Sequence, residues 1–464
     1  MTTDSNVSNR WSSRYAYILA ATGAAVGLGN IWKFPYIMGE NGGGAFVLVY
    51  LLCILFIGIP VMMAEVVIGK RGRSSPANAA AHCAIESQRS SYWSIIGSMG
   101  VVAGFLVLSF YVVIAGWAAA YVYFAASGEL SAAAANPSTH TDAIQQLFIG
   151  LITDSHQLLF WTTLIVIGVV IVITRGVKAG LEKAVSYLMP ALLFLLVSIM
   201  IYSSIVGNFN AAFSFMFDVD FSKLTIEGVL VALGHAFFTL SLASGIMMVF
   251  GAYLPQNVSI AKSSVMIAIA DTIVALIAGL AIYPIVFASG LEPTAGPGLL
   301  FQSLSVAFGN MPFGDLFGSL FFIMIVFAAF TSAIAMLEPT AAYLAERQGL
   351  SRFKAGCVAG LCIWLVSLLT IFSFSGEDWT KISFGMGNNL FEFLDYVTAN
   401  ILLPLGGLFI ALFVGWKMNK EMVKEELNLS GVQFTIVINL LRWIAPVAIL
   451  CVFVNSIGLL NFVN

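Results

Sequence analysis

The chain has 464 residues, of which 60% are hydrophobic and only 9% are charged, against roughly 25% charged in a typical soluble domain. No soluble core could bury so much apolar surface, so the composition excludes a cytosolic enzyme, a nucleic-acid-binding protein and a disordered chain. The formal net charge of −3 at pH 7 indicates no polyanionic partner.

A transmembrane helix needs about 20 mostly apolar residues, and eleven segments of the chain meet that requirement. They are, in chain order, 14–38, 43–69, 92–126, 157–174, 184–205, 228–253, 263–288, 315–345, 353–374, 388–416 and 433–462. Their apolar runs are continuous rather than alternating, which predicts helices instead of the strands of a membrane barrel. We therefore expect an all-α integral membrane protein of eleven spans in a lipid bilayer, preceded by a polar segment at 1–13.

The distribution of Lys and Arg predicts how these spans are oriented. With the N-terminus in the cytoplasm, the outer side keeps only Lys33, Lys223 and Lys381, and the long connection 127–156 carries neither Lys nor Arg. Basic residues gather in the cytoplasmic loops of membrane proteins. We expect a multi-pass protein of the inner (plasma) membrane, with a cytoplasmic N-terminus and, after an odd number of spans, an external C-terminus.

Two spans contain small and hydroxyl residues in place of the usual large apolar ones. The first span reads GAAVGLGNIWKFP from Gly23 to Pro35, and the sixth reads FFTLSLASG from Phe237 to Gly245. Such residues can simply allow close helix packing. Broken helices at matching positions of two halves instead mark a transporter site at the bilayer midplane, where freed carbonyls bind Na⁺ and half-helix N-termini bind a carboxylate.

Ionisable residues inside the spans are costly and usually mark function. For Glu338, Glu392 and Arg442, which lie near span ends, a structural ion pair or an interfacial position is an equal alternative. Asp271 lies well inside an apolar span, which favours a functional role. His235 lies next to the interrupted stretch of the sixth span, where a lone histidine is more often a packing residue. The full set of charged candidates is Lys33, Glu65, Asp271, Glu338, Glu392, Asp395 and Arg442.

The stretch GAAVGLGNIWKFPYIMGENGGGAF resembles the first-span motif of the neurotransmitter:sodium symporter family, in its bacterial amino-acid-transporter branch. Further matches are IPVMMAEVVIGKRGR, FFTLSLASG, AAFTSAIAMLEP, and Gly180 followed ten residues later by Pro190. These blocks in this order are highly specific, and the resemblance covers roughly residues 10–460.

The resemblance implies the leucine-transporter fold, a 5+5 inverted repeat of eleven transmembrane helices with helices one and six broken. The first repeat would be 14–205, with spans one to five, and the second would be 228–416, with spans six to ten. The last span, 433–462, would be peripheral, and 1–13 would be a cytoplasmic N-terminal segment.

The resemblance also implies two sodium sites. The first would be formed by the carbonyl of Ala25 with Asn30, Thr239 and Asp271, together with the carboxylate of the substrate. The second would be formed by the carbonyls of Gly23, Val26 and Ala328 with the hydroxyls of Thr331 and Ser332. Both sets offer the oxygen ligands that a hard cation such as Na⁺ requires.

A substrate pocket is implied as well, with the Tyr111 hydroxyl donating to the substrate carboxylate and Phe238 acting as a lid. The pocket residues would be Ala24, Ala25, Leu28, Gly29, Val107, Tyr111, Phe238, Thr239, Ser241, Ser244, Ser332 and Met336. Monoamine-carrying relatives have Asp at the position of Gly27, and the leucine transporter has Phe and Asn at those of Ser244 and Ala24. These differences leave room for a carboxylate and for a large side chain.

Gates would close the pocket on both sides. The outer gate would pair Lys33 with Asp395. Many relatives have Arg at the position of Lys33. Lys lacks the bidentate fork of Arg, so this latch is expected to be weaker or water-bridged. On the inner side Glu346 stands where relatives have Asp, but the expected Arg partner is Ser8. Arg10, next to Trp11, is a candidate substitute.

Together these features predict a sodium-coupled symporter that imports a zwitterionic amino acid, with a large hydrophobic or aromatic side chain, by alternating access. No catalytic triad or metal cluster stands out, so we do not expect an enzyme, and we expect a monomer or weak homodimer. Two alternatives stay open: an ion channel, and a membrane receptor that binds an amino acid without transporting it.

Chloride is not expected to take part in transport. Animal relatives bind Cl⁻ among side chains whose positions here are Tyr50, His235, Thr239, Asp271 and Ala275. Asp271 stands in place of Asn and supplies a fixed negative charge, and Ala275 stands in place of a chloride-binding Ser. The alternative is that Asp271 is protonated and only hydrogen-bonded.

Overall fold

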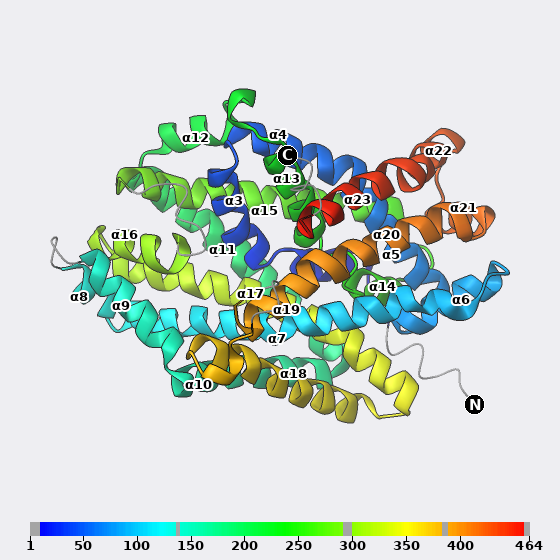
Figure 1. Ribbon diagram of the computed structural model, residues 1–464, viewed down its shortest axis with the longest axis horizontal. Coiled ribbons are helices and arrows are strands. Elements are labelled where there is room, and N and C mark those ends of the chain that lie inside the picture. The colour runs from blue at the N-terminus through cyan, green and yellow to red at the C-terminus, as the bar shows by residue number, and fades with distance from the viewer. Residues whose placement is uncertain (1–9, 136–139, 291–298, 383–387, 459–464) are drawn as a thin grey trace.

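The computed structural model describes residues 10–135, 140–290, 299–382 and 388–458. Within these ranges all regular elements are helices, which confirms the predicted all-α class. The long helices run along one common direction, with short helices at both ends of the molecule (Figure 1). Residues 1–9 of the predicted N-terminal segment and 459–462 of the last predicted span lie outside the described residues.

Nine helices of the described residues are long and apolar enough to span a membrane, and they match nine predicted spans. They are Gly44–Gly72, Ser91–Ala126, Ser155–Thr174, Val177–Val206, Ile260–Ala288, Gly314–Gln348, Arg352–Phe374, Leu390–Lys417 and Gly431–Ser456. One start differs clearly from the prediction, which placed it at 184. There the π-helical turn η4 (Val177–Glu182) adds a polar lead-in to α11 (Lys183–Val206).

The other two predicted spans are each split, as expected. Span 14–38 becomes α2 (Arg14–Ala25), η1 (Gly29–Lys33) and α3 (Phe34–Glu40). Span 228–253 becomes α13 (Ile226–Thr239) and α14 (Ile246–Ala252). The physical causes are local: Val26 is extended, at φ −69° and ψ 102°, whereas Ser241, Ala243 and Gly245 all have positive φ, a conformation that ends a right-handed helix.

The broken helices lie in the interior of the bundle. The most extensive helix pairing joins α7 (Ile95–Ala126) to α17 (Gly314–Gln348), and α2 packs against α15 (Ile260–Ala288), α17 and α11. The break between α2 and η1 and the break between α13 and α14 are therefore both enclosed by long helices. Unpaired backbone at these depths is tolerated only where it lines a protein cavity or binds a ligand.

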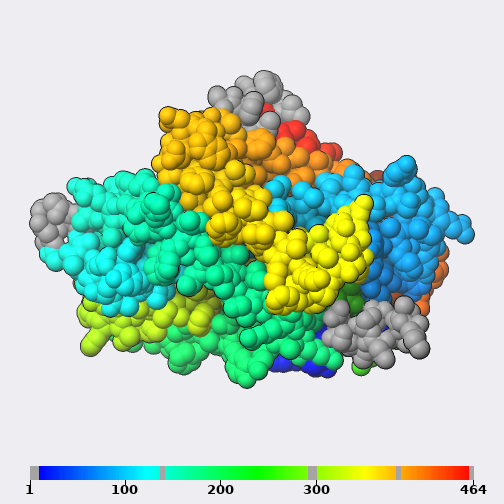
Figure 2. All heavy atoms as spheres, turned by 90° about the horizontal axis from the view of Figure 1, so that it is seen from below, coloured from blue at the N-terminus to red at the C-terminus, as the bar shows by residue number. Residues whose placement is uncertain are grey.

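The periphery of the bundle is apolar, as a membrane protein requires. On α10 (Ser155–Thr174) the side chains of Phe160, Leu164, Ile167 and Ile171 are each about half exposed and share one helical face. Residues of α10 and α11, coloured teal to green, occupy much of the middle of the surface seen in Figure 2. These faces are the ones that lipid would cover.

Short helices cover the two ends. One end carries α8 (Glu129–Ala134), α9 (His140–Thr153), α12 (Phe209–Phe217) and α16 (Leu304–Asn310), and the other carries α6 (Pro76–Glu86) and α21 (Lys420–Leu427) (Figure 1). Two further long helices, α18 (Arg352–Phe374) and α10, pack against each other at one side.

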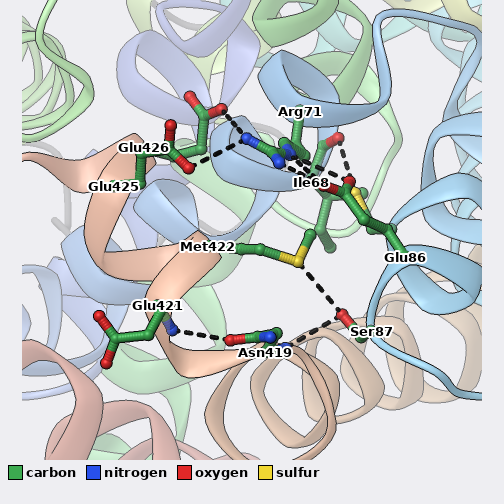
Figure 3. A network of polar contacts seen from close by, with 10 residues as sticks. Ile68, Arg71, Glu86, Ser87, Asn419, Glu421, Met422, Glu425 and Glu426 are labelled. Carbon is green, nitrogen blue, oxygen red and sulfur yellow. Dashed lines mark hydrogen bonds and ion pairs between the residues drawn. The ribbon is translucent and has the colours of Figure 1, made fainter.

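An ion-pair node ties α21 to the rest of the fold (Figure 3). Arg71, at the end of α5 (Ile59–Gly72), pairs with Glu86 of α6 and with Glu425 and Glu426 of α21. Lys70 adds a contact with Glu426 at 3.3 Å. This node connects three segments that are separated by up to 355 positions in the chain.

Candidate functional site

Three polar side chains from three helices meet at the two breaks. Asn30 of η1 donates from Nδ2 to Asp271 Oδ1 at 2.7 Å, and Thr239 at the end of α13 donates from Oγ1 to Asp271 Oδ2 at 3.0 Å. All three are fully buried, with exposed fractions of 0–1%. Ala25, the fourth residue expected here, is the last residue of α2 and is also buried. Three of the four protein ligands expected for the first sodium site thus lie together, with the Asp271 carboxylate between the other two.

A second oxygen cluster lies on the other side of the α2 break. Ser332 of α17 directs Oγ to the carbonyls of Gly23 and Val26, at 3.4 and 3.3 Å. Its neighbour Thr331 donates from Oγ1 to the carbonyl of Ala328 at 3.0 Å. Both residues are buried, with exposed fractions of 1% and 2%. The five residues expected for a second sodium site are therefore brought together by one contact face between α2 and α17.

The break between α13 and α14 is held open by a buried carboxylate. Glu65 of α5 accepts the backbone N–H of Ala243 at 2.5 Å, and its side chain is 0% exposed. On the other side of the break, Ser241 donates from Oγ to the carbonyl of Ala24 at 3.0 Å. The sequence marked Glu65 as an intramembrane charge but indicated no role for it. The structure shows that it satisfies backbone freed by the break.

A cavity of about 40 Å³ lies between the two breaks. Eleven of the twelve expected pocket residues line it, and the exception is Leu28. Its lining residues are Ala24, Ala25, Gly27, Gly29, Val107, Tyr111, Phe238, Thr239, Ser241, Leu242, Ser244, Ile246, Ser332, Met336 and Leu403. Leu28 instead lines a second, larger cavity and donates its N–H to the Tyr111 hydroxyl at 3.2 Å.

Two hydroxyls approach Gly27 closely in this pocket. A Cβ at this position would lie 2.6 Å from Ser332 Oγ and 2.8 Å from the Tyr111 hydroxyl. Leu242, Ile246 and Leu403 complete the apolar wall and were not predicted from the sequence. An apolar residue in an apolar span carries no signal of its own, so nothing in the pattern could have found Leu403 of α20 (Leu403–Leu412).

The expected outer gate residues face a larger cavity on the other side of Phe238. Lys33 and Asp395 both line this cavity, whose volume is about 410 Å³. The Lys33 ammonium lies 4.6 Å from the centroid of the Phe238 ring, a cation–π distance. Among the described ion pairs none joins Lys33 to Asp395. In this structure Lys33 therefore covers the lid residue instead of closing a salt bridge.

The two residues expected at the inner gate, Arg10 and Glu346, line a common cavity of about 450 Å³. The Glu346 carboxylate accepts the Ser75 N–H at 2.8 and 2.9 Å and the Asn78 amide at 2.9 Å. The described ion pairs include none between Arg10 and Glu346. Trp11, the neighbour of Arg10, is buried and donates from Nε1 to the Phe250 carbonyl at 3.0 Å.

The expected anion position is lined by aromatic rings and small apolar groups. His235 is 2% exposed and lies between Phe34 and Tyr50, with ring centroids 5.7 and 5.5 Å away. No described residue hydrogen-bonds its two ring nitrogens. Ala275, one turn after Asp271 on α15, is fully buried.

Two of the remaining intramembrane charges have structural partners. Glu338 pairs with Arg352 and accepts the Tyr253 hydroxyl at 2.7 Å. Glu392, in the first turn of α19 (Leu390–Tyr396), accepts the Asn388 N–H at 2.8 Å. For these residues the structural alternative fits the observed contacts.

Comparison with known proteins identifies the family to which this chain belongs. The family model described as the sodium:neurotransmitter symporter family matches residues 8–151 and 149–463. The chain belongs to this family. The motif-based assignment is thereby confirmed, and the symporter is a sodium-coupled multi-pass membrane transporter and not an enzyme.

The alignments with similar proteins span nearly the whole symporter. It is 36% identical over 457 residues to the uncharacterised sodium-dependent transporter YhdH of Bacillus subtilis (strain 168), covering 98% of each chain. It is 33% identical to an uncharacterised sodium-dependent transporter of Haemophilus influenzae, covering 98% and 100% of the two chains. The crystal structure of MhsT in complex with L-phenylalanine matches with a TM-score of 0.87 and 39% identity, covering 97% and 99%. This likeness confirms the leucine-transporter fold.

Proposed function

We propose that this symporter imports a zwitterionic α-amino acid with a large apolar or aromatic side chain, driven by two sodium ions and without chloride. One observation carries the proposal. The pocket between the two breaks is lined by Gly27 and several hydroxyl groups, and it has no acidic side chain among its lining residues to pair a lone amine. Such a pocket suits a substrate that brings its own carboxylate.

Two sodium ions are the proposed coupling cargo. One would be held by Ala25, Asn30, Thr239 and Asp271, with the substrate carboxylate. The other would be held by Gly23, Val26, Ala328, Thr331 and Ser332. The hydrogen bonds within these clusters support the assignment because they bring oxygen atoms together: Asn30 and Thr239 both contact the Asp271 carboxylate, and Ser332 contacts the Gly23 and Val26 carbonyls. Each positive charge that moves inward across the membrane gains about 2.3 kcal/mol per 100 mV.

The proposed choice of side chain rests on the apolar end of the pocket. Val107, Met336 and Leu403 line this end with Ser244, whose hydroxyl donates to the Ser241 carbonyl at 2.6 Å. Its short side chain leaves space that a Phe would fill, and Met336 can adapt to the shape of the guest. MhsT, a similar protein of known structure, was solved in complex with L-phenylalanine, and we propose that this chain binds an amino acid of that kind.

Chloride independence follows from the charge of Asp271. A carboxylate beside the first sodium ion already balances its charge. A chloride about 4 Å away would be repelled by roughly 4 kcal/mol at an effective dielectric constant of about 20. The buried methyl of Ala275 offers no donor to such an anion.

Transport would proceed by alternating access between two gated states. Lys33, Asp395 and Phe238 would close the outer path, and Arg10, Trp11 and Glu346 the inner one. We assign 14–205 and 228–416 to the two inverted repeats, with 433–462 peripheral. The protein would lie in the plasma membrane as a monomer or weak homodimer, with its N-terminus in the cytoplasm and its C-terminus outside.

The proposal is tested by uptake into vesicles that contain the purified protein. With an inward Na⁺ gradient we expect accumulation of radiolabelled phenylalanine, tryptophan or leucine, and none when K⁺ replaces Na⁺. Thr331→Ala with Ser332→Ala should abolish accumulation. Thr153→Ala, at an exposed hydroxyl outside the site, is the matched control. Equal uptake with and without Na⁺ would refute the proposal, as would a preference for glycine or proline over every larger amino acid.

A further inference from the structure

Arg442 is a charged residue in a membrane span that the transport site does not use. It is half-buried in η10 (Leu440–Ile444), within the span Gly431–Ser456. Its Nε donates to the Gly415 carbonyl at 2.5 Å. No carboxylate of the described residues pairs with it. A guanidinium has five N–H donors, so four of them have no hydrogen-bond acceptor within the described part of the chain.

Two tryptophans form an outward-facing platform around this guanidinium. The Trp416 ring lies 5.4 Å from the guanidinium carbon, and its Nε1 donates to the Arg442 carbonyl at 3.1 Å. The Trp443 ring packs edge-on against Trp416, with centroids 4.8 Å apart. The two tryptophans are 45% and 59% exposed. The platform therefore lies on the outer surface of the bundle.

The depth of this platform is set by the neighbouring span. Gly415 and Trp416 belong to η9 (Phe413–Lys417), the last turn of the span Leu390–Lys417, and η9 contacts η10. In Figure 1, α21 and α22 (Gly431–Asn439) extend toward the same end of the molecule. Tryptophan and basic residues are typical of the boundary between lipid tails and headgroups. Arg442 is thus level with the last turn of the neighbouring span, where lipid headgroups are expected, although it is well inside its own helix.

An exposed apolar track leads from the platform along the same helix. Trp443, Val447 and Leu450 follow one another at intervals of four and three residues, so they share a face. Their exposed fractions are 59%, 62% and 48%. A ligand that reaches Arg442 with a polar group can therefore lay an apolar chain on this face.

We propose that Arg442, Trp416 and Trp443 form a binding site for an anionic phospholipid. The phosphate accepts the free N–H donors of the guanidinium, which presents them in a fork that suits phosphate oxygens. One acyl chain follows Val447 and Leu450. The site favours an anionic over a zwitterionic headgroup because exposed Lys417 adds positive charge and no described carboxylate beside Arg442 can bind a headgroup amine. In the orientation proposed above, the lipid belongs to the cytoplasmic leaflet.

Lipid binding to the purified full-length protein tests this site. Native mass spectrometry in detergent compares phosphatidylglycerol with phosphatidylcholine of the same acyl chains. One basic residue near a membrane surface contributes about 1 kcal/mol, so we expect a preference of roughly fivefold for phosphatidylglycerol. Arg442→Gln should bring this ratio close to one, whereas Lys354→Gln, at an exposed lysine of α18, should leave it unchanged.

Two further arms separate a lipid site from a folding defect of the variant and from a site for soluble phosphate. Arg442→Lys keeps the charge without the fork, so it should retain part of the preference even if the Gln variant folds poorly. Glycerol phosphate, which has no acyl chains, should not displace the bound phosphatidylglycerol. The proposal is overturned by a wild type without preference, by an unchanged ratio in Arg442→Gln, or by full displacement with glycerol phosphate.

Discussion

At the scale of single residues, the chemistry of the site depends on one carboxylate with two donors. Asp271 accepts hydrogen bonds from Asn30 and Thr239, one on each oxygen. These donors come from the two broken helices, so the carboxylate joins both breaks to α15. A residue in this position controls both the charge and the geometry of the proposed first sodium site.

Replacing Asp271 should make transport depend on chloride. Asp271→Asn removes the fixed charge and keeps the shape, while Ala275→Ser adds a donor one turn away. We expect the double variant, in the vesicle uptake assay, to lose most activity when gluconate replaces chloride. The wild type should be indifferent to the replacement, and a wild type that stops without chloride would contradict our assignment.

Enlarging Ser244 should change which amino acids are carried. Ser244 is 6% exposed and lines the apolar end of the pocket. Ser244→Phe fills that space, so competition by tryptophan and phenylalanine should weaken at least tenfold relative to alanine or valine. Ser109→Phe is not a suitable control because this buried site would be overpacked. Ser198→Phe is suitable because half-buried Ser198 lies on the face of α11 that carries the exposed Phe194 and Ile201. An unchanged order of preference would show that Ser244 does not contact the side chain.

At the scale of elements, the two breaks are kept in shape by contacts from neighbouring helices. Ser332 of α17 contacts the carbonyls of the α2 break, and Glu65 of α5 accepts an N–H of the α13–α14 break. These contacts replace the hydrogen bonds that a continuous helix would make within itself. The breaks are thus features of the folded bundle rather than weak points of the isolated segments.

Removing the Glu65 carboxylate should destabilise the fold. Glu65→Ala leaves the buried N–H of Ala243 unsatisfied, at a cost of about 1–3 kcal/mol. Glu65→Gln retains an acceptor oxygen and should lose less. Thermal unfolding in detergent measures the difference, with Glu129→Ala, in the short outer helix α8, as control. Equal melting temperatures for Glu65→Ala and the wild type would show that the contact contributes nothing.

The ion-pair node of Figure 3 should make the free energy of unfolding depend on pH in the acidic range. Arg71 hydrogen-bonds Glu86 and holds the pKa of that carboxyl below its ordinary value of 4.5. A lowered folded-state pKa means that the ionised carboxylate stabilises the protein above pH 4.5. That stability is lost as pH falls through the lower folded value.

Arg71→Met should remove this acid-dependent component. Because the pair is partly exposed, we expect a loss of about 0.2–1 kcal/mol at pH 7 and a smaller loss below pH 4. Melting temperatures of both proteins between pH 3 and pH 8 measure it. Parallel curves for the variant and the wild type would place the origin of the acid sensitivity elsewhere.

At the scale of the whole molecule, the sequence predicted the helices well because lipid requires long apolar segments. The splits of spans one and six were predicted because small and hydroxyl residues, among them Gly23, Gly27, Ser241 and Gly245, cluster at matching positions of the two halves. The residues that form the apolar walls of the pocket were harder to predict from the sequence. Leu403 looks like every other apolar residue of its span, and Leu28 faces the second, larger cavity because of backbone angles at the break that no residue pattern specifies.

The long separations within the site have a consequence for how the chain folds. Asn30 and Asp271 are 241 positions apart, and Ser332 contacts the Gly23 carbonyl across 309 positions. During synthesis the first broken helix therefore enters the membrane long before its partner helices have been made. Until then, its unpaired carbonyls must hydrogen-bond with water, lipid headgroups or the insertion machinery. At the proposed second site, a sodium ion can link the first broken helix to α17 only after α17 has been inserted. Sodium in the medium during assembly should then raise the yield of folded protein, and not only its activity.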